Sequence, residues 1–103
     1  MALMQISIIP MGTETPSVGR FVADIQQLLT AVDADFVLND MGTVIHGNAV
    51  ELLRLAAEIH EHPFSKGAKR VVTQIVLDDR RDKERGIGEK RKAVLDIVAK
   101  REK

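Results

Sequence analysis

The sequence predicts an α+β fold in which one antiparallel sheet carries helices on one of its faces. Along the chain, apolar residues first alternate with a period of two and then follow a helical period, and this order recurs in the second half. The connection Asn39-Asp40-Met41-Gly42 has the composition of a β-hairpin turn. A chain of 103 residues suits one domain, which we expect to span residues 1–103.

The first third of the chain predicts a strand followed by a helix. Over residues 3–10, the polar Gln5 and Ser7 alternate with apolar side chains, as in a half-buried strand. Thr15 followed by a proline is typical of a helix start. The helix is expected over residues 16–32, with its inward side chains at helical spacing: Val18, Phe21, Val22, Ile25, Leu28, Leu29 and Val32.

The middle of the chain predicts a hairpin and a second helix. The hairpin strands are expected at residues 35–39 and 41–47. Asn48, with a glutamate three residues later, indicates the N-cap of a helix over roughly residues 49–62, and residues 63–67 are expected to break it. The side chains expected to face inward are Val50, Leu53, Ala56, Ala57 and Ile59.

The last third predicts a strand over residues 69–78, a polar connection over 79–88 and a helix over 89–101 that buries Val94, Ile97 and Val98. The order βαββαβ, followed by a C-terminal helix, defines a ferredoxin-like antiparallel sheet. Right-handed crossovers place its two main helices on the same face. The opposite face has no helix of its own, so we expect the last helix or another subunit to cover it, and therefore an oligomer.

Composition and charge exclude several classes of protein. The absence of cysteine excludes disulfides and thiolate metal sites. No apolar run reaches the ~18 residues that span a bilayer, and the N-terminus lacks the basic region of a signal peptide. Residues 1–79 carry ten acidic and five basic side chains (−5), whereas residues 80–103 carry five and ten (+5). Such a basic run is more often the solvent-exposed face of a helix, or the partner of an acidic surface, than a nucleic-acid-binding site. We therefore expect neither a membrane nor a nucleic-acid partner.

Four landmarks occur in an order that resembles a known family. They are Ile8-Ile9-Pro10-Met11-Gly12 with Ser17-Val18, then Met41 to Gly47, then Arg70 to Ile75, and finally Asp78 to Lys83 with Glu89-Lys90. On these landmarks the chain resembles the thiamine-binding-protein-like family, of the MTH1187/YkoF-like superfamily and formerly UPF0045/DUF77. The resemblance covers nearly the whole chain.

The resemblance implies a ferredoxin-like fold, a cytoplasmic location and dimers that pair into tetramers. It implies no required cofactor and no firmly attached catalytic activity, and related members bind thiamine or its hydroxymethylpyrimidine half. The family usually has glutamate before the glycine that ends the central strand, whereas this chain has His46. A histidine neither pairs with a cationic thiazolium nor accepts from an aminopyrimidine as a carboxylate does, so the ligand's identity stays open.

Four residues are candidates for ligand binding: Ser7, Asn39, Thr43 and His46. The first three could meet the donors and acceptors of an aminopyrimidine. On a regular strand Thr43 and His46 point to opposite faces, so both cannot line one flat site. The expected function is a non-enzymatic, oligomeric small-molecule-binding protein, for thiamine or hydroxymethylpyrimidine.

Two alternatives remain open from the sequence. The first is a structural or regulatory interaction module without a small ligand, and the second is an enzyme that acts on a thiamine-like heterocycle through His46. No nucleophile with a matching base is visible, so no catalytic residue is assigned.

Two further groups of side chains favour a structural interpretation. His60 and His62 do not share a helix face, so surface solvation is expected and no metal site is assigned. Asp78, Asp79 and Asp82 could bind a divalent cation. The arginines and lysine interleaved with them favour ion pairs within the cluster or across subunits instead.

Overall fold

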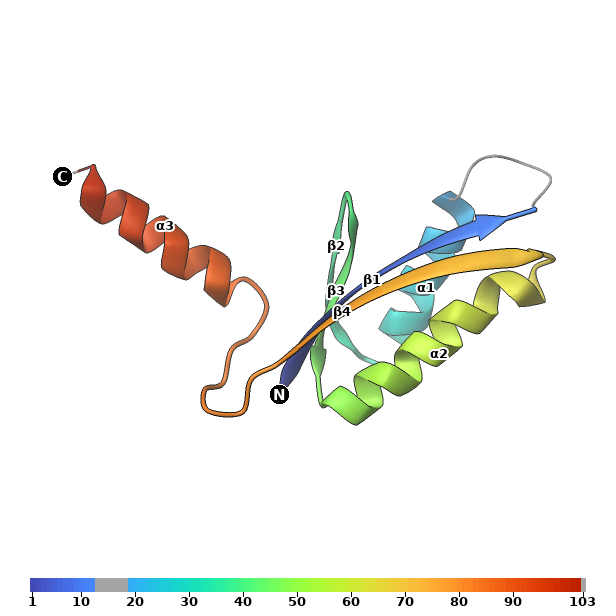
Figure 1. The fold of residues 1–103 in the computed structure, drawn as a ribbon, viewed down its shortest axis with the longest axis horizontal. Helices are drawn as coiled ribbons and strands as arrows, with labels where there is room; N and C mark the ends of the chain where they lie inside the picture. Colours follow the sequence, from blue (N-terminus) through green and yellow to red (C-terminus); the bar gives the residue numbers. More distant parts are fainter. Residues whose placement is uncertain (13–18, 103) are drawn as a thin grey trace.

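The computed structural model describes residues 1–12 and 19–102 and confirms the predicted ferredoxin-like α+β fold. Four strands cross the middle of the molecule, and α1 and α2 lie on one side of them (Figure 1). The expected N-cap at Thr15 lies outside the described residues. The elements are β1 Ala2–Met11, α1 Gly19–Ala31, β2 Asp35–Asn39, β3 Gly42–Gly47, α2 Ala49–Ser65, β4 Arg70–Asp79 and α3 Glu89–Arg101.

The strands form one antiparallel sheet in the order β2-β3-β1-β4. The central strand β1 pairs with β4 along its whole length, as far as Met11 opposite Arg70. Its pairing with β3 ends earlier, at Ile6 opposite Thr43. Beyond Ile6, therefore, β1 pairs with β4 along one edge. Among the described residues, no strand pairs with its other edge.

Alternation along β1 decides which side of the sheet faces the helices. Met4, Ile6 and Ile8 are buried beneath α1 and α2, whereas Gln5 and Ile9 are exposed on the other side, which we call the open face. This is the pattern of an antiparallel sheet with one covered side. The covered side holds the core: Ala2, Met4, Ile6, Ile8, Phe21, Ile25, Leu29, Ile45, Leu52, Ala56 and Ile59.

The second helix buries a different stripe from the one that the sequence analysis predicted. Leu52, Ala56 and Ile59 are buried, whereas Val50 and Leu53, both expected to face inward, are exposed, as is the expected Ala57. The helix carries two neighbouring apolar stripes, and the direction in which it crosses the sheet selects only one. The N-cap prediction is confirmed, because the Asn48 side chain accepts a hydrogen bond from the Val50 backbone N–H at 3.0 Å.

Helix α2 ends at Ser65, within the stretch 63–67 that was expected to break it, but later than the expected residue 62. Pro63 lies in the last turn, where its missing N–H removes a single helical hydrogen bond. Its ring is fully buried, and its carbonyl accepts from the backbone N–H groups of Lys66 and Ala68. The proline therefore packs beneath the helix end instead of terminating it.

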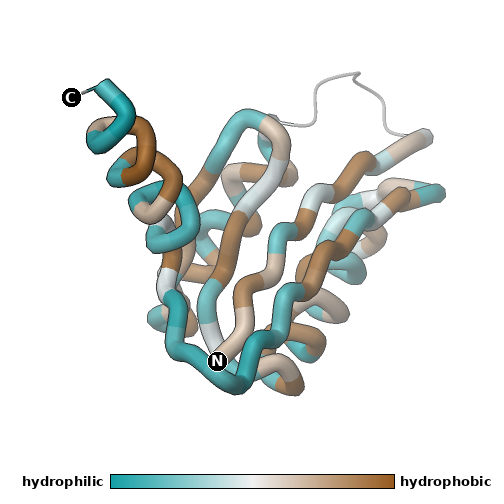
Figure 2. The backbone as a smooth tube through the Cα atoms, turned by 60° about the vertical axis from the view of Figure 1, so that its left-hand side comes forward, coloured by the Kyte–Doolittle hydropathy of each residue, from teal (hydrophilic) through white to brown (hydrophobic). Residues whose placement is uncertain are grey.

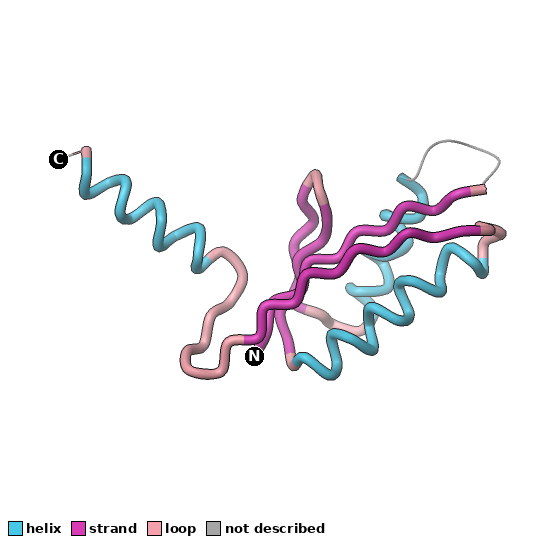
Figure 3. Tube along the Cα trace, viewed as in Figure 1, coloured by secondary structure: helices cyan, strands magenta, loops and turns pink. Residues whose placement is uncertain are grey.

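The last helix, α3, stands away from the rest of the molecule, on the side opposite α1 and α2 (Figure 3). The sequence analysis expected Val94, Ile97 and Val98 to be buried, but no residue of α3 is buried. No helix in the described part of the chain is long and apolar enough to cross a bilayer.

Candidate functional site

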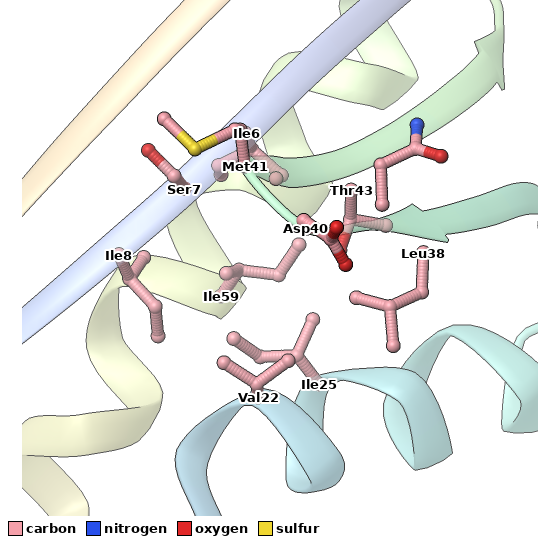
Figure 4. A pocket seen from close by; sticks show the side chains of 12 residues that line it. Ile6, Ser7, Ile8, Val22, Ile25, Leu38, Asp40, Met41, Thr43 and Ile59 are labelled. Atoms are coloured by element: carbon pink, nitrogen blue, oxygen red, sulfur yellow. The ribbon is translucent and has the colours of Figure 1, made fainter. Parts of the chain in front are cut away.

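One cavity lies where β1 extends past the end of β3. The tip of the β2–β3 hairpin, the free edge of β1 and the side of α1 enclose a volume of about 180 Å³. Figure 4 shows Leu38, Thr43 and Asp40 on the hairpin side of this cavity, which we call the hairpin pocket. It is lined by Ile6, Ser7, Ile8, Val22, Ile25, Leu38, Asn39, Asp40, Met41, Gly42, Thr43 and Ile59.

The walls of the hairpin pocket are mostly apolar. Ile6 and Ile8 come from β1, Val22 and Ile25 from α1, and Ile59 from α2. The helical spacing that places Ile25 in the core also directs the neighbouring Val22 toward the cavity. Such walls suit the faces of a flat ring, and the few polar groups can fix its orientation.

Thr43 is the most enclosed polar residue of the pocket, with 4% of its surface exposed. Its Oγ1 accepts a hydrogen bond from Gln26 Nε2 of α1 at 3.1 Å. A hydroxyl can both donate and accept a hydrogen bond, so the Thr43 hydroxyl hydrogen is still available to donate to a ligand. Gln26 thus fixes the hydroxyl while leaving it able to donate into the cavity.

Asp40 supplies the charge of the pocket. It occupies the hairpin tip, is exposed, and its carboxylate has no ion pair or hydrogen bond within the described part of the chain. A carboxylate at the mouth of an apolar cavity attracts a cationic or donor-rich group. A positively charged group that extends from the mouth of the pocket would therefore meet the Asp40 carboxylate.

Two more polar residues stand at the rim. Ser7 is half-buried on β1, at the point where the strand loses its neighbour β3, and Asn39 is exposed at the end of β2. Strand alternation places both residues on the open-face side of the sheet, opposite to Thr43. Gly42 faces them across a close approach of the hairpin to β1. A Cβ at this position would lie 3.1 Å from the backbone oxygen of Ile6. The glycine therefore allows the hairpin to pack tightly enough to close the pocket on this side.

His46, the fourth candidate, lies elsewhere. It points to the open face, beside Leu3 and opposite Asp35, with its Nδ1 3.5 Å from Asp35 Oδ2. Its Nε2 is buried and has no hydrogen-bond partner among the described residues. Thr43 faces the helices instead, so the two residues occupy opposite sides of the sheet, as the alternation predicts. A role for His46 in binding stays a prediction.

The other two histidines support the fold instead of facing solvent, so the expectation of surface solvation is wrong. His60 Nδ1 lies 2.7 Å from Thr73 Oγ1 of β4. His62 Nε2 lies 2.8 Å from Asp24 Oδ2 and links α2 to α1, and this hydrogen bond lowers the pKa of the Asp24 carboxyl below its ordinary value of 3.8. No group of three potential metal ligands occurs in the part of the chain that the structure describes.

The charged exit from β4 forms ion pairs within the chain, as predicted. Arg80 Nε donates to Asp82 at 2.7 Å, and Arg81 Nη2 donates to Asp79 at 2.8 Å. The arginine hydrogen bonds lower the pKa of both carboxyls. Asp78, the third carboxylate, pairs with Lys90 of α3. These pairs occupy the carboxylates that a cation would need.

Three of the four predicted site residues therefore meet in one pocket, and the sequence analysis missed several of its walls. Asp40 and Met41 were assigned to the hairpin turn, and Val22, Ile25 and Ile59 to the core. The only local sign of the pocket in the sequence was a turn that contains both a carboxylate, Asp40, and a long apolar side chain, Met41. The cavity itself arises from unequal strand lengths, which appear only once the register is known.

The fold and the pocket define a class: a ferredoxin-like α+β protein with a small, mostly apolar cavity at its hairpin tip. The sequence profile described as thiamine-binding protein matches residues 4–95. The chain belongs to this family, as its landmarks suggested.

Several relatives are similar over most of their length. A UPF0045 protein of Staphylococcus xylosus is 45% identical over 98 residues, which cover 91% of this chain and 92% of that protein. The UPF0045 protein YqgV of Bacillus subtilis is 47% identical over 87 residues, with 81% and 84% covered.

Solved structures share the fold. The protein MJ1052 of Methanocaldococcus jannaschii has a TM-score of 0.78 and 33% identity, with 90% of this chain and 94% of that chain covered. A Thermotoga maritima protein, named for a suggested role in thiamine biosynthesis or salvage, has a TM-score of 0.72 and covers 90% of this chain and 97% of its own. At 17% identity this second likeness shows the fold alone.

Proposed function

We propose that the protein binds a small flat heterocycle in the hairpin pocket without transforming it, and that this heterocycle is the hydroxymethylpyrimidine half of thiamine, alone or within thiamine. The observation that carries the proposal is the cavity of about 180 Å³, with apolar walls and a polar hairpin rim. Membership of the thiamine-binding protein family supports the choice of ligand.

The size of the cavity favours a single ring. An apolar cavity of about 150 Å³ holds benzene, and pockets for drug-sized molecules start at about 300 Å³. The hairpin pocket, at about 180 Å³, falls between the two and matches one substituted pyrimidine. The rest of a thiamine molecule would extend through the mouth of the pocket.

The polar groups suit an aminopyrimidine. The Thr43 hydroxyl, held by Gln26, can donate to a ring nitrogen. Asp40 can pair with the cationic thiazolium outside the pocket. Asp40 would then supply the negative charge that His46 does not.

Calorimetric titration with hydroxymethylpyrimidine, and separately with thiamine, tests the proposal. We expect saturable binding tighter than roughly 10 μM, or about −7 kcal/mol. Thr43→Val should weaken both ligands about five- to tenfold, because a net hydrogen bond contributes about 1 kcal/mol. Thr30→Val is the matched control, since Thr30 is exposed on α1 and does not line the pocket. A folded protein that binds neither ligand would contradict the proposal and favour an interaction module.

A substitution at His46 distinguishes the hairpin pocket from the open face. If the ligand occupies the pocket, His46→Glu should leave the affinity for thiamine within about twofold, because His46 lies on the other side of the sheet. A clear gain in affinity would instead place the cationic ligand near His46.

Self-association and a cytoplasmic location form part of the proposal. Apolar side chains on the open face and on α3 are exposed in the single chain, which supports a homodimer or homotetramer. None of the relatives described above carries an enzyme name, which supports binding without catalysis. No cofactor is needed for this function.

A further inference from the structure

We propose that Gln26 determines which rings the hairpin pocket accepts, because its side chain sets the direction of the Thr43 hydroxyl hydrogen. With Gln26 as hydrogen-bond donor to Thr43, the pocket selects rings that present an unprotonated nitrogen and rejects rings that present an N–H at the same place. The inference rests on the proposed function, since it concerns the ligand of the same pocket. Gln26 does not line the pocket itself and acts through Thr43, as a positioning residue.

Thr43 has an unusual position for a polar side chain. Hydrophobic positions recur along the strands, with hydrophilic ones interspersed among them (Figure 2), and the covered side of the sheet holds the apolar core. Among the residues that the structure describes, Thr43 is the only buried polar side chain. The strand register places it between Ile6 of β1 and Leu38 of β2, and Ile45 follows on the same side of β3. Its neighbours within the sheet are therefore apolar and offer its hydroxyl no side-chain partner.

Gln26 supplies the hydrogen bond that this hydroxyl makes within the protein. It lies one helical turn after Val22, on the stripe of α1 that borders the pocket. Its Nε2 donates to Thr43 Oγ1 at 3.1 Å, and the described part of the chain contains no second partner for that oxygen. An amide nitrogen cannot accept a hydrogen bond, so the Thr43 hydrogen has to point away from Gln26.

The geometry of a hydroxyl then decides what the ligand has to offer. Its hydrogen occupies one of three staggered directions around the Cβ–Oγ1 bond. In Thr43 the direction toward Gln26 meets a donor, and the apolar neighbours provide no acceptor, which leaves the direction of the cavity. A ring nitrogen without a hydrogen accepts the bond there. A ring N–H would instead leave the buried Thr43 hydrogen without an acceptor, which is unfavourable.

The ligand class that follows is a ring with an acceptor nitrogen, as in an aminopyrimidine. The corresponding oxo ring has a carbonyl in place of the amino group and a hydrogen on the adjacent ring nitrogen, so its hydrogen-bonding pattern is reversed. The two rings have nearly the same size and shape, and apolar walls discriminate weakly between such isosteres. Discrimination between them therefore depends on the hydroxyl that Gln26 orients.

Gln26→Glu tests the inference, because it exchanges a donor for an acceptor of nearly the same size. The introduced carboxylate should draw the Thr43 hydrogen toward α1 and leave a lone pair facing the cavity. Wild type and variant are titrated calorimetrically with hydroxymethylpyrimidine and with its oxo analogue, at about pH 7, where the introduced carboxyl is ionised. We expect wild type to bind the amino ring at least about tenfold more tightly than the oxo ring, and Gln26→Glu to lower this affinity ratio at least about tenfold.

Two controls separate hydrogen-bond polarity from the added charge. Gln27→Glu places the same charge on the next residue of α1, which is exposed and does not line the pocket, and should change the affinity ratio less than about twofold. In a Thr43→Val background, Gln26→Glu should also leave the ratio within about twofold, because the hydroxyl through which Gln26 acts is missing. A merely structural role of Gln26 would weaken both ligands and leave their ratio unchanged.

Three results would overturn the inference and leave the proposed function intact. One is a wild-type protein that binds both rings but prefers the oxo analogue. Another is an unchanged affinity ratio in a folded Gln26→Glu variant, as judged by circular dichroism, while Thr43→Val still weakens the binding of hydroxymethylpyrimidine. The third is an equal change of the ratio in Gln27→Glu, since charge alone would then explain the effect. A folded wild-type protein that binds neither ring would remove the proposed function together with the inference.

Discussion

Asp24 and His62 form a contact between α1 and α2 whose contribution depends on pH. Their hydrogen bond, 2.8 Å long, lowers the pKa of the Asp24 carboxyl in the folded protein. Because the unfolded chain binds this proton at a higher pH, the contribution is present above about pH 4 and is lost as the pH falls through the lower, folded pKa.

Asp24→Asn should therefore reduce stability near pH 5 and make progressively less difference as the pH falls below 4. Urea unfolding midpoints measured between pH 3 and pH 6 for both proteins check this expectation. Asp33→Asn is the control, because Asp33 is exposed, has no ion pair within the described part, and has a left-handed φ of 56° that asparagine also accepts. A difference between wild type and Asp24→Asn that stays constant with pH would contradict the assigned role.

Thr43 and Gln26 illustrate what a single residue contributes to the site. Alternation along the strand predicted that Thr43 and His46 point apart, and the structure confirms it. The partner of Thr43 could not be predicted, because Gln26 lies on a helix whose rotation about its own axis is fixed by packing. A polar pair of this kind depends on the tertiary structure.

At the scale of the element, α2 shows how much the sequence determines. Its cap was predictable, since the capping chemistry of Asn48 is local. Its buried face was not, because neighbouring leucines at positions 52 and 53 belong to different apolar stripes. Leu52 is 2% exposed and Leu53 is 48% exposed. The packing of the helix against the sheet therefore determines which of the two stripes is buried.

Leu52→Ala and Leu53→Ala provide a matched pair on this helix. The first should reduce the free energy of unfolding by about 2–5 kcal/mol, since it removes a buried side chain and leaves a cavity. The second should change the free energy by about 1 kcal/mol or less, because half of the side chain already contacts water. Denaturant unfolding of both variants checks the difference, and similar losses would show that the buried stripe is wrongly assigned.

The hairpin pocket is also a property of elements and not of single residues. The turn composition predicted the hairpin and placed Asn39 near its tip. The cavity beside it depends on β3 pairing with β1 only as far as Ile6, while β4 continues to Met11. Sequence periodicity gives the ends of each strand to within about two to four residues, which is too coarse to predict such a step.

At the scale of the whole molecule, the dominant feature is the extended shape. The radius of gyration of the Cα atoms is 15.9 Å, whereas a compact chain of this length has about 13 Å. The longest dimension is 54 Å, and α3 accounts for it (Figure 1). The sequence predicted the helix itself but not that its apolar side chains stay exposed.

Self-association should weaken as salt increases. If the basic α3 meets the acidic surface of a neighbour, the attraction is screened when the Debye length falls from about 10 Å at 0.1 M salt to about 3 Å at 1 M. We expect the dissociation constant, measured by sedimentation equilibrium, to rise at least fivefold over this range. A constant that falls with salt would indicate a contact dominated by apolar burial.

The step between β3 and β1 also suggests how ligand choice could change among proteins of this shape. Because the cavity fills the space that a longer β3 would occupy, one additional residue pair at the hairpin tip would narrow it, and one pair fewer would enlarge it. The change itself would be confined to the hairpin tip, so insertions and deletions in a single turn offer a route to new ligands.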